Sequence, residues 1–326
     1  MTDTEKSTKR VWWFWLGLGG ILLLSLSLRF WGLERFNTLV FDEVYYAKFA
    51  NNYLTNTRFF DGHPPLSKYL IAIGIWIGNR LPIGRDTVNL LTGSPLSTWS
   101  YRWLNALTGS FIPLVIAAIA YQLSQRRTFA LIAAALSAMD GLFLVESRYA
   151  LNNVYLVIFG LIGQWFVLLS LRDRKKSIML LSLAGVFFGA SASIKWNGLW
   201  FLFSIYLLWG IACSFRLIHQ LRYSQKTSEF PLETSTFTSP LYRLTQIHYS
   251  VTFWLTLTLV PVIFYWLIWI PHIHLNPEFN FIEVQRQILI YHRNVGSGMD
   301  IHPYCSTWYS WILMMRPVAY FYQVAN

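Results

Sequence analysis

Residues 11–30 read VWWFWLGLGGILLLSLSLRF, and Arg29 is the only ionisable side chain in this run. An α-helix needs about 20 mostly apolar residues to cross the hydrocarbon core of a bilayer, so the run predicts a membrane-spanning helix. The composition agrees, because 55% of the 326 residues are hydrophobic and only 13% are charged. That is about half the charged share of an average globular chain. The composition excludes a disordered chain, a collagen-like fibre and a disulfide scaffold.

A secretory signal peptide is the alternative interpretation of this run, because Lys6, Lys9 and Arg10 precede it. The run is long for a signal peptide, however, and it ends in Arg29-Phe30-Trp31 without a small-residue cleavage site. We therefore expect a first span over 11–30 and a cytoplasmic segment over 1–10.

Six further runs have the length and apolar character of membrane spans. They cover residues 103–123, 129–145, 151–171, 178–194, 198–215 and 251–270. The short connections at 126–127 and 172–176 are basic, which assigns them to the cytoplasm by the positive-inside rule. The sequence thus predicts an all-α polytopic membrane protein with about seven transmembrane helices and an inside N-terminus.

Two long segments then face the outer side, residues 31–102 and residues 271–326. The first is more than a plain loop. It contains Leu66–Gly78, an apolar run too short to cross, which predicts an amphipathic or re-entrant helix at the membrane surface. Residues 103–215 hold spans two to six, and the polar residues 216–250 form a cytoplasmic linker before the seventh span at 251–270.

Basic residues outnumber acidic ones by 26 to 15, and the formal net charge is +11. No soluble basic domain is evident that would bind nucleic acid, so we expect anionic lipid or an anionic substrate as the partner. Cations recur on the outer side beside predicted span ends: Lys68, Arg102, Arg148, Lys195, Arg293 and Arg316. Snorkelling to the headgroups explains any one of them, but their convergence on one side favours a lipid-linked phosphate.

The same side carries two adjacent carboxylates, Asp42 and Glu43. A structural role is open to both, because Asp is a favoured helix N-cap and Glu suits the first helical turn. In the functional alternative, one carboxylate is the general base for an acceptor hydroxyl. Further along, His63 and Lys68 flank Pro64-Pro65, which make a rigid entry into the short helix.

Four stretches resemble the protein O-mannosyltransferases, which are polytopic glycosyltransferases of the GT-C architecture. The first is FDEVYYA at 41–47 followed by FFDGHPPLSK at 59–68, the second is Tyr101-Arg102, and the third is SIKWNGL at 193–199. The fourth combines Tyr291-His292, His302-Pro303-Tyr304, STWYSW at 306–311 and Met315-Arg316-Pro317. They follow the family's order over most of the chain from about Phe30 onward.

The resemblance implies inverting transfer of mannose from a polyprenyl-phosphate carrier to Ser/Thr hydroxyls of exported polypeptides. By motif position, Asp42 is the expected catalytic base, with Glu43 beside it in the acceptor site. Arg102, Arg148 and Lys195 are expected to bind the donor phosphate, whose charge grows as the glycosidic bond breaks. Weaker candidates for the substrate groove are His63, Lys68, His302 and Trp308.

The expected partners are polyprenyl-phosphate-mannose, Ser/Thr-containing exported polypeptides and membrane lipid, without nucleic acid. The sequence has no nucleotide-binding glycine loop and no His/Cys metal cluster, so we expect neither a cofactor nor a metal site. Dependence on a divalent metal stays open. The expected location is the plasma membrane of a prokaryote or the endoplasmic reticulum of a eukaryote, with the catalytic loop on the non-cytoplasmic side.

Two departures from the family bear on these expectations. Asn153 stands where many members carry Asp, which weakens the idea of a metal or a second acid at that position. Members usually continue through about four more spans, whereas this sequence stops at Asn326. A truncated product, one half of a split enzyme with a separately encoded C-terminal half, and an incomplete gene model are the alternatives.

Other functions compete with this interpretation. A GT-C transferase of another sugar, or one acting on a lipid or glycan acceptor, would carry the same carboxylates and cations. An inactive fragment or assembly partner is a second alternative. A transporter would place ionisable groups near the bilayer midplane, but Asp140 is the only acid close to the interior of a predicted span.

Overall fold

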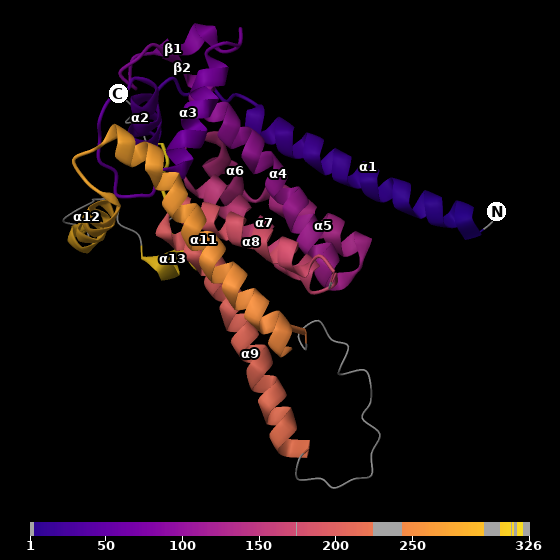
Figure 1. The fold of residues 1–326 in the computed structure, drawn as a ribbon. Coiled ribbons are helices and arrows are strands. Elements are labelled where there is room, and N and C mark those ends of the chain that lie inside the picture. The colour runs from indigo at the N-terminus through magenta and orange to yellow at the C-terminus, as the bar shows by residue number, and fades with distance from the viewer. Residues whose placement is uncertain are drawn as a thin grey trace. The chain divides into compact units, whose positions relative to one another are not determined.

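The computed structural model describes residues 3–173, 175–223, 243–296, 307–313, 315 and 318–321. Helices dominate the described part of the chain (Figure 1). The chain forms two compact units, which we describe separately. Unit 1 comprises Met1–Trp31, Asn105–Arg148 and Asn152–Ile268, and unit 2 comprises Gly32–Leu104, Tyr149–Leu151 and Trp269–Asn326.

Unit 1 is built from long apolar helices. They are α1 (Asp3–Phe30), most of α4 (Thr98–Ser124), α5 (Arg127–Met139), α6 (Gly141–Arg148), α7 (Asn153–Ser170), α8 (Ser177–Ile194), the short 3-10 helix η2 (Trp196–Gly198), α9 (Leu199–Tyr223) and most of α11 (Ile247–Leu275). Among the described residues, six helices are long and apolar enough to cross a membrane, or seven if α5 and α6 count as one bent span. The predicted all-α fold with about seven spans is confirmed.

The predicted span over 129–145 is not one straight helix. The chain bends by 55° between α5 and α6. Asp140 adopts an extended backbone at the break, and its Oδ1 accepts a hydrogen bond from Phe143 N at 2.9 Å. The side chain therefore caps the start of α6, and Asp favours this position because its short carboxylate reaches the first backbone N–H groups.

Helices also extend beyond the apolar runs. The helix α9 continues to Tyr223, into the first residues of the predicted cytoplasmic linker. The prediction placed the boundary too early because hydropathy marks where a segment stops being apolar, and a helix can continue past that point. Residues 224–242 of that linker lie outside the described residues.

Small residues let the helices of unit 1 approach closely. The helices α7 and α8 pack along each other (Figure 1), and Gly163 lies directly under the ring of Phe188. A Cβ atom at Gly189 of α8 would lie only 2.9 Å from the backbone oxygen of Pro261 in α11. Close approach of this kind is how membrane helices gain packing contacts where lipid offers no hydrophobic driving force.

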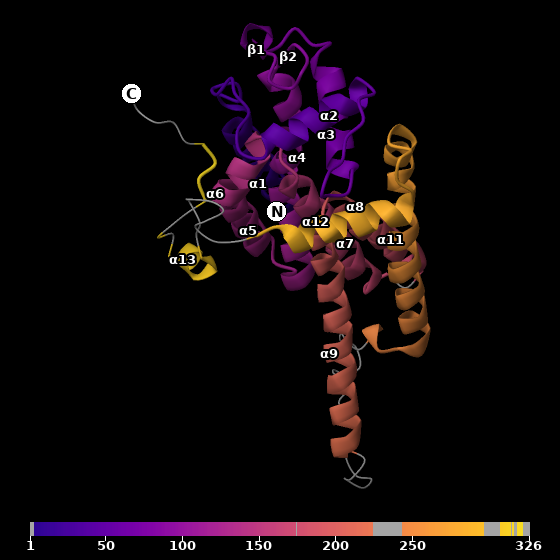
Figure 2. The same ribbon diagram turned by 90° about the vertical axis from the view of Figure 1, so that its left-hand side faces the viewer.

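Unit 2 combines short helices with a small hairpin. Its elements are α2 (Glu43–Leu54), α3 (Leu66–Gly78), the 3-10 helix η1 (Arg85–Thr87), β1 (Val88–Asn89), β2 (Leu96–Ser97), the first turns of α4, the last turns of α11, α12 (Phe281–Asn294) and α13 (Trp308–Ile312). Figure 2 shows α2 and α3 beside each other, with the antiparallel β1–β2 pair close by. The helix α3 has the bounds of the short helix predicted from the sequence, and its position at the membrane surface remains a prediction.

The end of α11 and the first loop are joined by partly buried polar contacts within unit 2. The backbone N–H of Phe59 donates to Asn276 Oδ1 at 2.8 Å, and the Tyr53 hydroxyl lies 2.5 Å from His272 Nδ1. Burial raises the pKa of Tyr53 well above its ordinary value, so its hydroxyl stays protonated and can donate. These contacts connect α2 and the segment after it to residues more than 200 positions later in the chain.

The close contact at Gly189 generates a stability prediction. The Gly189→Ala variant should melt at a lower temperature in detergent, because the added methyl group meets the backbone of α11 and overpacking costs about 1–3 kcal/mol. Gly210→Ala is the matched control, since no atom lies within 4 Å of the position of its Cβ and Ala favours a helix over Gly. A melting temperature for Gly189→Ala at or above that of Gly210→Ala would contradict this packing.

Candidate functional site

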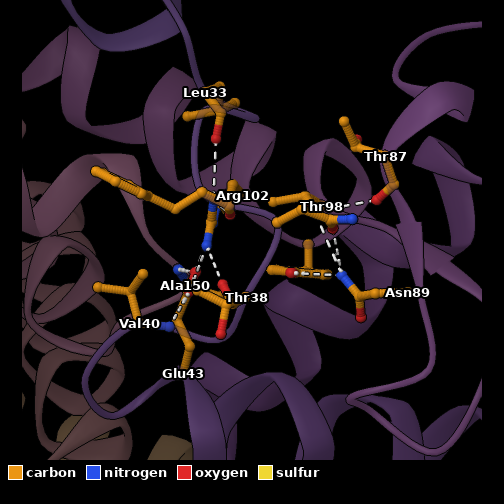
Figure 3. Close-up of polar contacts among 12 residues, drawn as sticks. Leu33, Thr38, Val40, Glu43, Thr87, Asn89, Thr98, Arg102 and Ala150 are labelled. Carbon is orange, nitrogen blue, oxygen red and sulfur yellow. Dashed lines mark hydrogen bonds and ion pairs between the residues drawn. The ribbon is translucent and has the colours of Figure 1, made fainter. Parts of the chain in front are cut away.

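The candidate site in unit 2 is organised by an ion pair between Glu43, at the start of α2, and Arg102, in α4 (Figure 3). Arg102 Nε donates to Glu43 Oε1 at 2.9 Å, and Arg102 Nη2 donates to Oε2 at 2.7 Å. Both side chains are 0% exposed. The two parallel bonds form the bidentate geometry that matches a guanidinium to a carboxylate.

Backbone groups complete the bonding of the Glu43 carboxylate. The N–H of Val40 donates to Oε2 at 2.8 Å, and the N–H of Ala150 donates to Oε1 at 2.7 Å (Figure 3). With the two bonds from Arg102, each carboxylate oxygen accepts two hydrogen bonds from the protein. Glu43 therefore fixes the loop before α2 and the 149–151 segment, and it has no exposed surface with which to touch an acceptor.

Arg102 is equally occupied. Besides its bonds to Glu43, it donates to the backbone oxygens of Leu33, Phe36 and Thr38 at 2.8–3.0 Å. All five N–H groups of a guanidinium are thereby used within the protein. The sequence predicts that Arg102 binds the donor phosphate, but a fully buried side chain with every donor engaged does not support that role. Its contacts make it the anchor of the loop that leads to α2.

Asp42 lies immediately before α2 and is half-buried. It occupies the N-cap position, but its side chain makes no capping hydrogen bond, so the structural alternative raised by the sequence is not realised. The Tyr46 hydroxyl lies 3.5 Å from Asp42 Oδ2. Unlike its neighbour Glu43, Asp42 keeps part of its side chain accessible to a substrate.

The backbone before Asp42 is strained. Phe41 has a φ of 52°, a left-handed conformation that is costly for a large side chain. Such strain persists only where neighbouring contacts over-determine the conformation. Here the bond from Val40 to Glu43 fixes the following turn, and the Phe41 ring packs 4.8 Å from the ring of Tyr320. Strained residues of this kind concentrate at functional sites, which makes this turn a candidate.

Aromatic and imidazole rings extend the site from Tyr46. The His63 ring lies 6.3 Å from the Tyr46 ring and 5.2 Å from the His292 ring. His292 Nε2 is 2.9 Å from the backbone oxygen of Gly62, which fixes it against the turn that carries His63. Our sequence reasoning did not single out His292 as a site residue, although the Tyr291-His292 pair belongs to one of the stretches that carry the family resemblance.

Lys68 holds that turn in place. Its ammonium is fully buried, forms an ion pair with Asp61 Oδ2 at 2.5 Å, and donates to the backbone oxygens of His63 and Pro64. Burial lowers the pKa of Lys68 from its ordinary value, and the charge of Asp61 opposes that shift. The three donors of the ammonium thus have protein partners, so Lys68 positions His63 and its contacts do not support direct binding of substrate.

Unit 1 contains a separate cavity of about 220 Å³ beside Lys195. Lys195 follows the end of α8 and lines the cavity together with Glu146 and Asn153. The Asn153 amide donates a hydrogen bond to Glu146 Oε1 at 3.0 Å. Arg148, which is half-buried, donates to the backbone oxygen of Leu28 at 2.7 Å. The cavity therefore combines apolar walls with a cation, a carboxylate and an amide.

One buried cation was missed by sequence reasoning. Arg29 near the end of α1 is fully buried, and it donates from Nη1 to Ser25 Oγ at 2.7 Å and to the backbone oxygen of Ala138 at 3.3 Å. Within the described part of the chain, its Nε and Nη2 have no hydrogen-bond partner. An ionisable residue inside a span is a functional signal by default, and the sequence did offer that signal.

The remaining predicted site residues are less informative. His302 lies outside the described residues. Trp308 begins α13, is largely exposed, and makes an edge contact with Tyr309. Across residues 3–173, 175–223 and 243–296 and the described positions after 306, no group of three or more His, Cys, Asp or Glu side chains is arranged to hold a metal ion.

Comparison with known proteins identifies relatives of this chain. A protein-family model described as dolichyl-phosphate-mannose-protein mannosyltransferase matches residues 21–276. Protein O-mannosyltransferase 1 of Drosophila pseudoobscura is 28% identical over 185 residues, which cover 55% of this chain and 20% of that protein. The polyprenol-phosphate-mannose–protein mannosyltransferase of Corynebacterium glutamicum is 27% identical over 161 residues, which cover 43% of this chain and 28% of that protein.

A solved structure has a similar fold. It is the S. cerevisiae protein O-mannosyltransferase Pmt1-Pmt2 complex bound to the sugar donor, and it matches with a TM-score of 0.59 at 21% identity. The match covers 80% of this chain and 34% of that chain. At this identity the likeness is one of fold. The chain spans well under half the length of these relatives.

The buried ion pair generates a prediction about stability. Glu43→Ala should lower the free energy of unfolding by about 3–5 kcal/mol, because it leaves the Arg102 guanidinium buried without its counter-charge. Arg58→Ala is the matched control, since the side chains of the Arg58–Glu278 pair are 61% and 63% exposed and an exposed pair contributes at most about 1 kcal/mol.

A double-mutant cycle in detergent checks the coupling. Glu43→Gln with Arg102→Met should cost less than the sum of the two single changes, since the double variant removes both charges together. If the loss in free energy of unfolding in the double variant equalled the sum of the losses in the two single variants, the ion pair would be contradicted.

Proposed function

The chain belongs to the dolichyl-phosphate-mannose-protein mannosyltransferase family, and from this we propose that it transfers mannose from a polyprenyl-phosphate carrier to Ser/Thr hydroxyls of exported polypeptides. Its relatives and its apolar helices make it an integral, multi-pass membrane protein.

The contrast between Asp42 and Glu43 carries the proposal. Two adjacent carboxylates have opposite environments, one half-buried and the other fully buried with every oxygen occupied. We assign the general-base role to Asp42, which can reach a substrate. Glu43 and Arg102 then act as positioning residues, because their bonds hold the backbone on both sides of Asp42 and fix the direction of its side chain.

The proposed reaction is a single displacement with inversion. Asp42 accepts the proton of the Ser/Thr hydroxyl, and the hydroxyl oxygen forms a bond to the anomeric carbon of mannose. The bond from that carbon to the carrier phosphate oxygen breaks, and the phosphate leaves with the electron pair. Negative charge grows on the phosphate, so a nearby cation accelerates the step by stabilising the transition state more than the bound donor.

We assign the donor phosphate to Lys195, with Arg148 as a second cation. Lys195 borders the 220 Å³ cavity of unit 1, and the half-buried Arg148 retains surface that the fully buried Arg102 lacks. His63 is proposed to line the acceptor groove near Asp42, since Tyr46 contacts both residues. We propose Trp308 and His302 as further residues that contact the acceptor.

The topology is proposed from the charge pattern of the sequence. The basic connections at 126–127 and 172–176 lie on the cytoplasmic side, and the segment 31–102 that carries Asp42 lies on the other side. This membrane is the plasma membrane in a prokaryote or the endoplasmic reticulum in a eukaryote. The acceptor therefore meets the enzyme as an exported polypeptide.

The base assignment predicts the effect of Asp42→Asn. Proteoliposomes that contain the full chain are supplied with polyprenyl-phosphate-mannose carrying a radioactive sugar and a Ser/Thr-rich peptide, and the labelled peptide is counted. Asp42→Asn should reduce turnover by about 10²–10⁴-fold, the usual contribution of a general base, while the melting temperature stays near that of the unchanged protein. Asp86→Asn, a change at an exposed carboxylate, is the control.

Two results would overturn the proposal. Full activity of Asp42→Asn at normal abundance would exclude Asp42 as the base. Label transferred only from a different sugar donor, or only to a lipid or glycan acceptor, would replace mannose transfer to proteins with another reaction of the same architecture.

The phosphate assignment predicts a different signature for Lys195→Gln. Loss of one cation from the phosphate site should lower kcat/KM for the donor by about 10- to 100-fold and leave KM for the acceptor peptide unchanged. Lys175→Gln, at an exposed lysine in a short connection, should change neither constant. An unchanged kcat/KM for the donor, or a rise in the acceptor KM as large as the rise in the donor KM, would exclude a specific role at the phosphate.

A further inference from the structure

A second hollow in unit 1 is unrelated to the site described above. It is a groove of about 640 Å³ between α1 and α4, with α7 on one side and the start of α5 at one end. Its walls include Leu18, Gly19, Ala117, Ala118 and Trp165, and Arg127 lies at the end. The volume falls within the range of about 300–1,000 Å³ that is typical of sites for small molecules.

Small residues on two faces create this groove. A Cβ atom at Gly19 would meet no atom within 4 Å, so the side of α1 that carries it is open. Two residues earlier, a Cβ atom at Gly17 would already lie 3.0 Å from Leu131 of α5. The helix α1 therefore packs on α5 through one face and leaves the Gly19 face uncovered, opposite the small side chains of Ala117 and Ala118.

The groove has an apolar length and a cationic end. Arg127, at the start of α5, is half-buried there, next to Gln122 near the end of α4. Arg172 is close to the same end, since its Nη2 donates to the backbone oxygen of Gln122 at 2.8 Å. The lining residues of α4, α5 and α7 lie in the halves of these helices that adjoin the connections at 126–127 and 172–176, so the two arginines mark one side of the membrane. The lining residues of α1, at 14–22, occupy the middle of that helix.

We propose that the groove binds an anionic phospholipid, with an acyl chain along Leu18, Gly19 and Ala117 and the headgroup phosphate at Arg127. A guanidinium at the end of an apolar trough in a membrane protein favours a ligand that is apolar along its length and anionic at its end. An apolar helix of another protein would match only the apolar walls, whereas a phospholipid matches both the apolar length of the groove and the positive charge at its end.

The binding is tested by native mass spectrometry of the full chain in a neutral detergent, with phosphatidylglycerol or phosphatidylcholine added at equal concentration. The unchanged protein should retain one phosphatidylglycerol in preference to phosphatidylcholine. Gly19→Leu fills the groove and should reduce the lipid-bound fraction by about tenfold. Arg127→Gln should remove the preference for the anionic lipid, because the charge-assisted contact is lost.

Gly20→Leu is the matched control for the filled groove. Gly20 also has no atom within 4 Å of its Cβ position, but it does not line the groove, so this variant should bind lipid like the unchanged protein. Equal retention of the two lipids by the unchanged protein would overturn the proposal, as would unaltered binding by Gly19→Leu. A change of oligomeric state in Gly19→Leu, seen in the same spectra without loss of lipid, would assign the groove to another copy of the chain instead.

Discussion

The buried pair of Glu43 and Arg102 is the constraint on which the arrangement of unit 2 depends. Two charges that lie away from water are tolerated only when their hydrogen-bonding capacity is satisfied, because desolvation otherwise outweighs their attraction. The protein meets that requirement with backbone groups on both sides of the pair, from the loop that ends at Val40 to the segment around Ala150. The loop has little freedom as a result, and Asp42 lies at its end, immediately before α2.

Much of the fold could be predicted because apolar runs of spanning length have few alternatives in a membrane. The short helix α3 was predicted with the bounds it has, since a mostly apolar run of 13 residues between Pro65 and Asn79 has clear ends. The bend at Asp140 was not predicted. At Asp140 the chain stops one helix, and the Asp140 side chain caps the next. The apolar pattern of residues 129–145 is compatible both with this break and with one continuous helix.

The sequence identified many of the residues of the candidate site, but it did not predict what several of them do. A cation at the end of a span is equally suited to bind a phosphate or to bond backbone oxygens, and the sequence does not reveal which acceptors the fold brings near it. Arg102 and Lys68 proved to be surrounded by backbone oxygens and a carboxylate. Their roles depend on contacts with segments whose positions are set by tertiary structure, such as the loop at Leu33–Thr38 in the case of Arg102.

The structure therefore divides the basic residues by how far their donors are used. Arg102 and Lys68 are fully buried, and every one of their donors has a protein partner, so they serve the fold. Lys195 and Arg127 are half-buried and border hollows with apolar walls, where an anionic ligand could reach them. The basic residues that are in excess on this membrane protein therefore serve different purposes. The cations of the second kind are the ones we propose for phosphate recognition, and their partial exposure at the wall of a hollow distinguishes them from the first.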